Sequence, residues 1–273
     1  MCRVYNSAPL PFMGQKRRFV RDFREVLKRF DDVTTIVDLF GGSGLLAHVA
    51  KRERPEARVI YNDYDYFCKR IEHVATTNRI LARLRELLRD VPEMKRLPPE
   101  LRREVLAVIA GYEREGYVDY PTLGSSLLFS GKWANDYEEL ASHTMYNCVK
   151  KSDYKVDGYL DGLEIVHRDY REIFAEHKDD ARTLFLIDPP YLSTEVGSYK
   201  CYWKLRDYLD VLSLLVGTKY IYFTSEKSQI IELCEWLTEN PMRANPFAGA
   251  EMRTQLNNIN YDRSFTDIML VKA

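Results

Sequence analysis

The sequence lacks the cysteine pattern that a disulfide-stabilised or zinc-binding protein shows. Its five cysteines are an odd number, and no two of them stand in a Cys-x-x-Cys spacing. The five histidines are equally scattered. We therefore expect no structural metal and no metal in the functional site.

Long apolar runs are missing too. The longest uncharged ones, such as residues 211–216, are far shorter than the roughly 18 residues that a membrane span needs. The first six residues also lack the apolar centre of a secretory signal. We expect a cytoplasmic protein without a membrane partner, and no obligate protein partner can be inferred.

The 273 residues carry almost no net charge, with 40 Lys and Arg against 41 Asp and Glu. This balance excludes functions that need a uniformly basic surface. The charge is unevenly distributed, however, because residues 1–118 carry +6 and residues 119–273 carry −7. Since the basic stretch 16–29 lies in the first half, we expect a localised cationic face.

What is present is a pattern of short apolar strands that alternate with helices. Residues 34–40 form a β-branched run that ends in a glycine turn, and apolar residues at helical spacing follow. Further strands are expected at 57–61, 163–166, 183–187, 219–224 and 264–271, with helices near 205–216 and 228–237. This alternation predicts an α/β protein with a Rossmann-like, mostly parallel sheet.

The alternation stops between residue 66 and about residue 162. The first part of this stretch is helix-like and basic, and the second part is rich in turn formers and aromatics. Residues 150–153 could close a hairpin. We expect a catalytic core made of residues 1–65 and 163–273, and an inserted domain of helices and a hairpin at 66–162.

The turn after the first strand contains Gly42 and Gly44 in a loose dinucleotide-binding fingerprint, and Asp63 follows at the end of the second strand. Glycines let the backbone pass close to a ligand, and a carboxylate at that strand end can accept both hydroxyls of a ribose. Nicotinamide, flavin and S-adenosylmethionine enzymes all use this pattern, and some glycine turns bind no ligand. The motif alone leaves the cofactor open.

Asp188-Pro189-Pro190-Tyr191 directly follows the predicted strand 183–187. Two prolines can simply end a strand. The same residues also suit methyl transfer to an exocyclic amine of a nucleobase, whose lone pair is delocalised into the ring. Asp188 and the carbonyl of Pro189 would accept the two amine hydrogens, and the prolines would hold both acceptors rigidly. Tyr191 would stack on a base taken out of its helix, and we favour this catalytic interpretation because of the strand context.

With these motifs the chain resembles the Dam-type N6-adenine DNA methyltransferases of the alpha group (D12 class). The matching motifs follow the family's order along nearly the whole chain, at residues 12–16, 38–44, 62–63, 169–170, 188–191, 223–225 and 260–271. The resemblance implies a site-specific enzyme that transfers a methyl group from S-adenosylmethionine to a flipped adenine in double-stranded DNA. It would be a bacterial or phage protein, associated with the nucleoid through DNA. Whether it accompanies a restriction nuclease stays open.

The resemblance also implies roles for single residues. The catalytic residues would be Asp188, Pro189, Pro190 and Tyr191. Residues implied to bind the cofactor are Phe12, Gly14, Lys16, Asp38, Phe40, Gly42, Gly44, Asp63, Asp169, Tyr170 and Asp188. Lys16 suits the methionyl carboxylate, although it could also be a solvated charge at a helix start, and Tyr170 could be a core residue.

In this family the segment between the second and third strands recognises the target, which here is the insertion at 66–162. Basic helices fit phosphate contacts, and aromatic side chains fit contacts to base edges. The residues expected to touch DNA are Arg17, Arg18, Trp133, Lys150 and Lys151. The arginine- and asparagine-rich hairpin signature of members that read GATC is absent, so the recognition sequence stays open.

Several other functions fit the sequence only in part. RNA and guanine N2 methyltransferases also carry Asp-Pro-Pro-Tyr, but residues 12–16 and the long insertion argue against them. The cytosine N4 amine would fit the same acceptors. An inactive DNA-binding relative would not need Asp63 and Asp188, and a nicotinamide oxidoreductase would leave 188–191 without a role. Cytosine C5 methylation needs a cysteine after a proline, and none of the five cysteines follows one.

Overall fold

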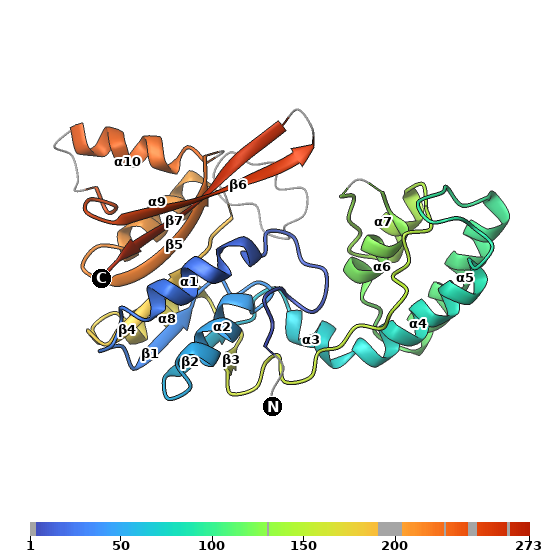
Figure 1. The fold of residues 1–273 in the computed structure, drawn as a ribbon, viewed down its shortest axis with the longest axis horizontal. Helices are drawn as coiled ribbons and strands as arrows, with labels where there is room; N and C mark the ends of the chain where they lie inside the picture. Colours follow the sequence, from blue (N-terminus) through green and yellow to red (C-terminus); the bar gives the residue numbers. More distant parts are fainter. Residues whose placement is uncertain (1–3, 130, 191–203, 227, 240–244, 261–262) are drawn as a thin grey trace. The chain divides into compact units, whose positions relative to one another are not determined.

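The computed structural model describes residues 4–129, 131–190, 204–226, 228–239, 245–260 and 263–273. These residues divide into two compact units (Figure 1). The core unit contains the described residues of 4–7, 15–65 and 160–273, and the inserted unit contains residues 8–14 and the described residues of 66–159. The target-recognition role expected for residues 66–162 stays a prediction.

The core unit is built on a seven-stranded sheet with the order β3-β2-β1-β4-β5-β7-β6. Its strands are β1 (Thr35–Asp38), β2 (Arg58–Asn62), β3 (Glu164–Val166), β4 (Thr183–Ile187), β5 (Lys219–Ser225), β6 (Glu251–Asn260) and β7 (Arg263–Lys272). Strands β1 to β5 pair in parallel, whereas β7 is antiparallel to both β5 and β6. The predicted Rossmann-like, mostly parallel sheet is therefore confirmed.

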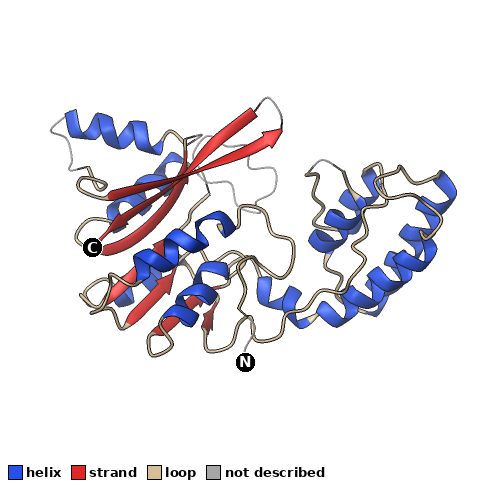
Figure 2. Cartoon of the chain, in the orientation of Figure 1, coloured by secondary structure: helices blue, strands red, loops and turns tan. Residues whose placement is uncertain are grey.

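Helices cover both faces of this sheet (Figure 2), which explains why every residue of β1 and β4 is buried. The helices of the core unit are the short 3-10 helix η1 (Arg17–Phe19), α1 (Val20–Leu27), α2 (Leu45–Glu53), α8 (Tyr170–His177), α9 (Leu205–Leu214) and α10 (Ile230–Glu239). Alternate strand residues such as Val37 and Phe185 pack against α8, α9 and α10. On the opposite face, Phe19 and Phe23 contact the Phe223 ring of β5.

The order of strands reverses between β1 and β4. From β1 the chain continues outward to β2 and β3, and then returns to the other side of β1 as β4. The register pairs Asp38 with Leu186, so the ends of β1 and β4 lie side by side. Such a switch point at the carboxyl edge of a parallel sheet is where open α/β proteins bind their ligands.

The inserted unit consists of helices around a separate apolar core. These helices are α3 (Phe67–Glu72), α4 (Val74–Leu87), α5 (Pro99–Glu115), α6 (Tyr120–Leu127) and α7 (Tyr137–Ser142). Buried residues of α4 recur at helical spacing, namely Ile80, Leu81 and Leu84, and face apolar residues of α5, α6 and α7. The helical part of the predicted insertion is thus present.

The hairpin expected around residues 150–153 is wrong. In the described part of the inserted unit, residues 145–147 instead form backbone hydrogen bonds with the loop between α4 and α5. Met94 donates to the carbonyl of Asn147, Asn147 donates to Lys95, and Leu97 donates to Met145, at 2.8–2.9 Å. These backbone groups are therefore satisfied by a distant segment, and the local turn signal of Lys150-Lys151-Ser152-Asp153 does not close a strand pair.

None of the helices in the described ranges is long and apolar enough to cross a membrane.

Candidate active site

The glycine turn lies at the switch point, between the end of β1 and the start of α2. Gly42 and Gly44 have φ values of +48° and +71°, which glycine adopts without strain. Gly41 is required for a different reason, because a Cβ atom there would lie 2.3 Å from the ring of Tyr61. The turn therefore follows a path that only glycines permit at these three positions.

Tyr61 connects the glycine turn to the acid after β2. Its fully buried side chain places the hydroxyl 2.8 Å from the carbonyl of Gly42 and 3.0 Å from Oδ1 of Asp63, so these two acceptors share one proton. Asp63 is itself 5% exposed. Tyr61 was not among the residues predicted for the site. The available signal is its position two residues before Asp63, which places both side chains on one side of the extended chain.

Asn62 joins the ends of three neighbouring segments. Its Nδ2 donates to the carbonyls of Leu39 and Arg168, at 3.1 and 3.0 Å, and its Oδ1 accepts from the backbone amide of Arg168 at 3.1 Å. The buried amide therefore fixes the turn that leads from β3 into α8 against the end of β1. Asn62 therefore has a structural role beside the motif at residues 62–63 in which the sequence placed it.

Lys16 and Asp188 form an ion pair at the end of β4. The Lys16 ammonium lies 2.6 Å from Oδ2 of Asp188, and the two side chains are 6% and 18% exposed. The alternative that Lys16 is a solvated charge does not apply. Burial raises the pKa of Asp188, Lys16 lowers it, and the negative charge of Asp267 adds to the increase, with an elevated pKa as the net result.

Asp38 supplies a second buried carboxyl group at this edge. It is 1% exposed, and burial together with the charge of Asp188 raises its pKa to about 8. The backbone amides of Ala47 and Phe40 and the Lys16 ammonium offset only part of this effect. Neither carboxylate oxygen makes a hydrogen bond of good geometry to a described residue. A buried acid of this kind is suited to a ligand that brings hydrogen-bond donors.

Phe40 and Tyr170, two residues expected to bind the cofactor, contact each other. The rings of Phe40 and Tyr170 lie 4.9 Å apart, and both side chains are half-buried. Asp169, the neighbour of Tyr170, has another structural task. Its exposed carboxylate caps α8 by accepting a hydrogen bond from the amide of Arg171 at 2.8 Å.

The remaining predicted residues are spread over both units. Phe12 and Gly14 belong to the inserted unit, where the Phe12 ring contacts Phe67 at 5.7 Å. Pro189 and Pro190 follow β4 directly, whereas Tyr191 lies outside the described residues.

The residues expected to touch DNA are also divided between the units. Trp133 is half-buried in the inserted unit, Lys150 lies 4.2 Å above the Tyr154 ring, and Lys151 pairs with Glu93 on the surface. Arg17 and Arg18 are exposed in the core unit. The roles of all these residues stay predictions.

The residues at the switch point fit S-adenosylmethionine by their donors and acceptors. Asp38 and Asp63 are acceptors for an ammonium group and for ribose hydroxyls, and Lys16 is a cation for a carboxylate. The described residues contain no group of three or more side chains arranged to hold a metal ion.

The strand order, the glycine turn and the acids after β1, β2 and β4 together define the Rossmann-like methyltransferase fold, whose usual methyl donor is S-adenosylmethionine. No protein-family model matches the sequence. The chain is 38% identical over 246 residues to a Haemophilus influenzae protein named "Putative methyltransferase", and the alignment covers 87% of this chain and 82% of that protein. The chain belongs to this methyltransferase family.

Proposed function

We propose that this methyltransferase modifies the N6 amine of adenine in a specific site of double-stranded DNA, with S-adenosylmethionine as the methyl donor. The observation that carries the proposal is Asp188-Pro189-Pro190 at the carboxyl end of β4, next to the glycine turn after β1. An acceptor pair of this kind serves an exocyclic amine, and the fold supplies a cofactor site beside it.

Asp188 would act as the acceptor of one amine hydrogen, and the carbonyl of Pro189 as the acceptor of the other. Both are held rigidly, because the φ angles of the two prolines are fixed and Lys16 anchors Oδ2 of Asp188. Preorganised acceptors stabilise the charge that develops on the amine nitrogen. Lys16 also opposes protonation of Asp188, which keeps the carboxylate able to accept.

The cofactor would be held by Lys16, Asp38 and Asp63, with Phe40 against it and the turn at Gly42 and Gly44 beneath it. When bound, S-adenosylmethionine supplies a methyl group that is already activated by its sulfonium. The protein then has to orient the amine and exclude water, and such positioning supplies a large part of the rate. Tyr61 supports this arrangement by holding Asp63 to the turn.

An adenine inside a duplex cannot reach a buried carboxylate, so the base would be flipped out of the helix. The inserted unit offers side chains that suit nucleic acid. Phe129 is 46% exposed and contacts Tyr146 at 5.5 Å, and Lys150 lies nearby in sequence on the ring of Tyr154. Aromatic side chains can contact bases, and lysines can contact phosphates. These features support DNA as the substrate.

The test is transfer of tritium from labelled S-adenosylmethionine to duplex DNA by the wild type, Asp188→Asn and Asp179→Asn. Asp179 is a matched control because it is an exposed acid of the same unit. We expect label in DNA with the wild type and the control, and a loss of at least about 100-fold with Asp188→Asn. Chromatography of the digested DNA should identify N6-methyladenine.

Label in RNA alone, or undiminished label with Asp188→Asn, would contradict the proposal. N4-methylcytosine or N2-methylguanine in the digest would retain the role of Asp188 and replace adenine as the target base.

A further inference from the structure

Helix α1 and the short 3-10 helix η1 before it carry a row of cations. The sequence does not tell which of these cations have partners, whereas the structure does. Seven Lys and Arg residues stand between residues 16 and 29. Lys16 pairs with Asp188, and Arg18 donates to the carbonyl of Leu256. Arg24 pairs with Glu53 at 3.1 Å, and Arg29 with Glu251. These four charges are therefore committed to partners within the core unit.

The other three cations, Arg17, Arg21 and Lys28, are exposed and have no anionic partner among the described residues. We call them the α1 stripe. Two acids on the same helix do not neutralise it. Glu25 and Asp22 both pair with Arg253, at 3.1 and 3.9 Å, and Asp22 also accepts a hydrogen bond from the side chain of Gln255.

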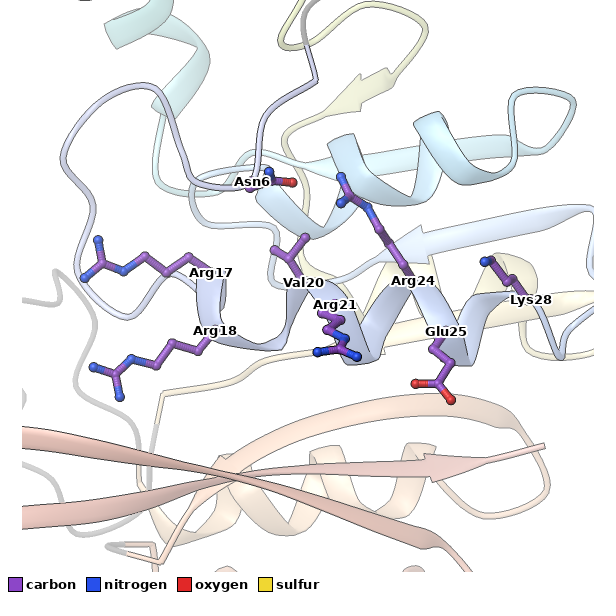
Figure 3. A pocket seen from close by; sticks show the side chains of 8 residues that line it. All are labelled: Asn6, Arg17, Arg18, Val20, Arg21, Arg24, Glu25 and Lys28. Atoms are coloured by element: carbon purple, nitrogen blue, oxygen red, sulfur yellow. The ribbon is translucent and has the colours of Figure 1, made fainter.

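The α1 stripe borders a shallow hollow of about 510 Å³ (Figure 3). Its lining consists of Asn6, Arg17, Arg18, Val20, Arg21, Arg24, Glu25 and Lys28. Five of these eight side chains are cations, and Val20 is the one aliphatic side chain. Pockets for small organic ligands are predominantly apolar. The hollow therefore suits an extended, highly charged anion rather than a compact ligand.

The geometry of the stripe matches a charged polymer. Arg21 and Lys28 are seven residues apart, which places them on one side of α1, and Arg17 stands four residues before Arg21 in η1. Arg21 and Lys28 are about 10 Å apart along the helix axis at 1.5 Å per residue. Duplex DNA presents about one phosphate per 1.7 Å of its axis. Several phosphates thus face a stripe of this length.

The stripe also has a rigid support. Phe23, Val26 and Leu27 on the opposite side of α1 are buried, and Phe23 contacts the Phe223 ring of β5. The cations are therefore presented by a helix that is fixed to the sheet. A fixed cationic row loses less entropy on binding than the same charges on a mobile segment.

We propose that the α1 stripe is a docking surface of the core unit for the sugar-phosphate backbone of duplex DNA. The proposal rests on the proposed function, because it takes the substrate DNA as the polymer. It adds Arg21 and Lys28 to Arg17, which the sequence already predicts to touch DNA, and it leaves out Arg18, whose guanidinium donates to the carbonyl of Leu256. These contacts are independent of base sequence, and they would hold the duplex on the catalytic unit during the search for a site.

The experiment measures the affinity of the full chain for a duplex of random sequence over a series of salt concentrations. The variant Arg17→Gln/Arg21→Gln/Lys28→Gln removes the stripe. The control Lys178→Gln/Arg182→Gln/Arg206→Gln removes three exposed cations from elsewhere in the core unit. The slope of log K against log salt is negative, and loss of three phosphate contacts should reduce its magnitude by about 2.7, whereas the control should leave it near the wild-type value.

A second variant, Arg17→Lys/Arg21→Lys, keeps the charges and should keep the slope, which separates loss of charge from misfolding. Equal slopes for the stripe variant and the control triple would overturn the inference. So would a stripe variant that binds DNA normally and loses binding only to vesicles of anionic lipid. If the proposed function fails instead, methyl transfer to DNA will be absent while the stripe-dependent slope persists on duplex RNA or DNA.

Discussion

A carboxyl group that is enclosed by protein and lacks strong hydrogen bonds favours its protonated form. Asp38 is in this situation, because burial and the neighbouring Asp188 raise its pKa to about 8. In an unfolded chain its pKa is about 3.9. The folded, ligand-free protein should therefore hold a proton on the Asp38–Asp188 pair at neutral pH, and a cofactor that brings donors would bind to this site.

The raised pKa of Asp38 makes the free energy of unfolding decrease as pH rises. A group with a raised pKa binds more protons in the folded state, so its contribution is full below pH 4 and is lost as pH rises to about 8. We predict that the free energy of unfolding of the ligand-free protein falls by about 1.4 kcal/mol per pH unit between those limits because of Asp38. Asp38→Asn should remove this dependence and be more stable than the wild type above pH 8. Urea denaturation at several pH values measures both.

Glu164→Gln is a control at a carboxyl group whose pKa is lowered in the folded state instead of raised. Arg58 lowers the pKa of Glu164 through two hydrogen bonds of 2.7 Å, so this pair weakens only as pH falls into the acid range. Both side chains are about half exposed, and the effect on stability should be small. An Asp38→Asn variant whose unfolding free energy runs parallel to that of the wild type from pH 4 to 8 would show that Asp38 is ionised in the fold.

At the scale of elements, the turn between β1 and α2 sets the positions of the site residues. Gly41→Ala should lower the free energy of unfolding by about 1–3 kcal/mol, because its Cβ would meet the Tyr61 ring at 2.3 Å and the Asn62 carbonyl at 2.9 Å. The displaced Tyr61 would also release Asp63, so affinity for S-adenosylmethionine should fall. Calorimetric titration and chemical denaturation measure the two effects.

Gly111→Ala is the matched control for that substitution. Gly111 lies inside α5, and no atom lies within 4 Å of the position of an added Cβ. Alanine should therefore stabilise the protein by about 0.5–1 kcal/mol through helix propensity and leave cofactor affinity unchanged. If the two variants behaved alike, the close packing of the turn on Tyr61 would have no energetic role.

The strands β1, β4 and β5 could be predicted from the sequence because parallel strands covered on both faces are continuous apolar runs. Strand β6 was not predicted. Its sequence, Glu251–Asn260, is mostly polar, and it forms at the sheet edge by pairing with β7 over its whole length. Such pairing depends on the partner strand and leaves little local pattern.

The candidate site likewise contains some residues that could be predicted from the sequence and some contacts that only the structure shows. Four site residues could be predicted because they stand in local motifs that are typical of ligand binding or methyl transfer. These residues are Gly42, Gly44, Asp63 and Asp188. The ion pair of Lys16 with Asp188 joins two segments that are far apart in the sequence, and only the folded chain brings the two side chains within 2.6 Å. The link from Tyr61 to Gly42 likewise depends on the register of β1 and β2.

At the scale of the whole molecule, each of the two units has an apolar core of its own among the described residues. One lies against the sheet and includes Val211, and the other lies among α4 to α7. The core of the inserted unit is supplemented by a buried ion pair, in which Arg70 donates to Asp119 at 2.9 Å and to the carbonyl of Pro11 at 2.7 Å. Units with separate cores need not unfold together.

We therefore predict two transitions in calorimetric unfolding of the full chain. Asp119→Ala should lower one of them strongly, because it leaves Arg70 buried without its carboxylate, a change that costs about 3–5 kcal/mol. It also removes the cap that Asp119 provides for α6 by accepting from the amide of Thr122. Val211→Ala, a truncation in the sheet core, should lower the other transition by about 2 kcal/mol. A single transition that both substitutions shift together would mean that the two units unfold as one cooperative body.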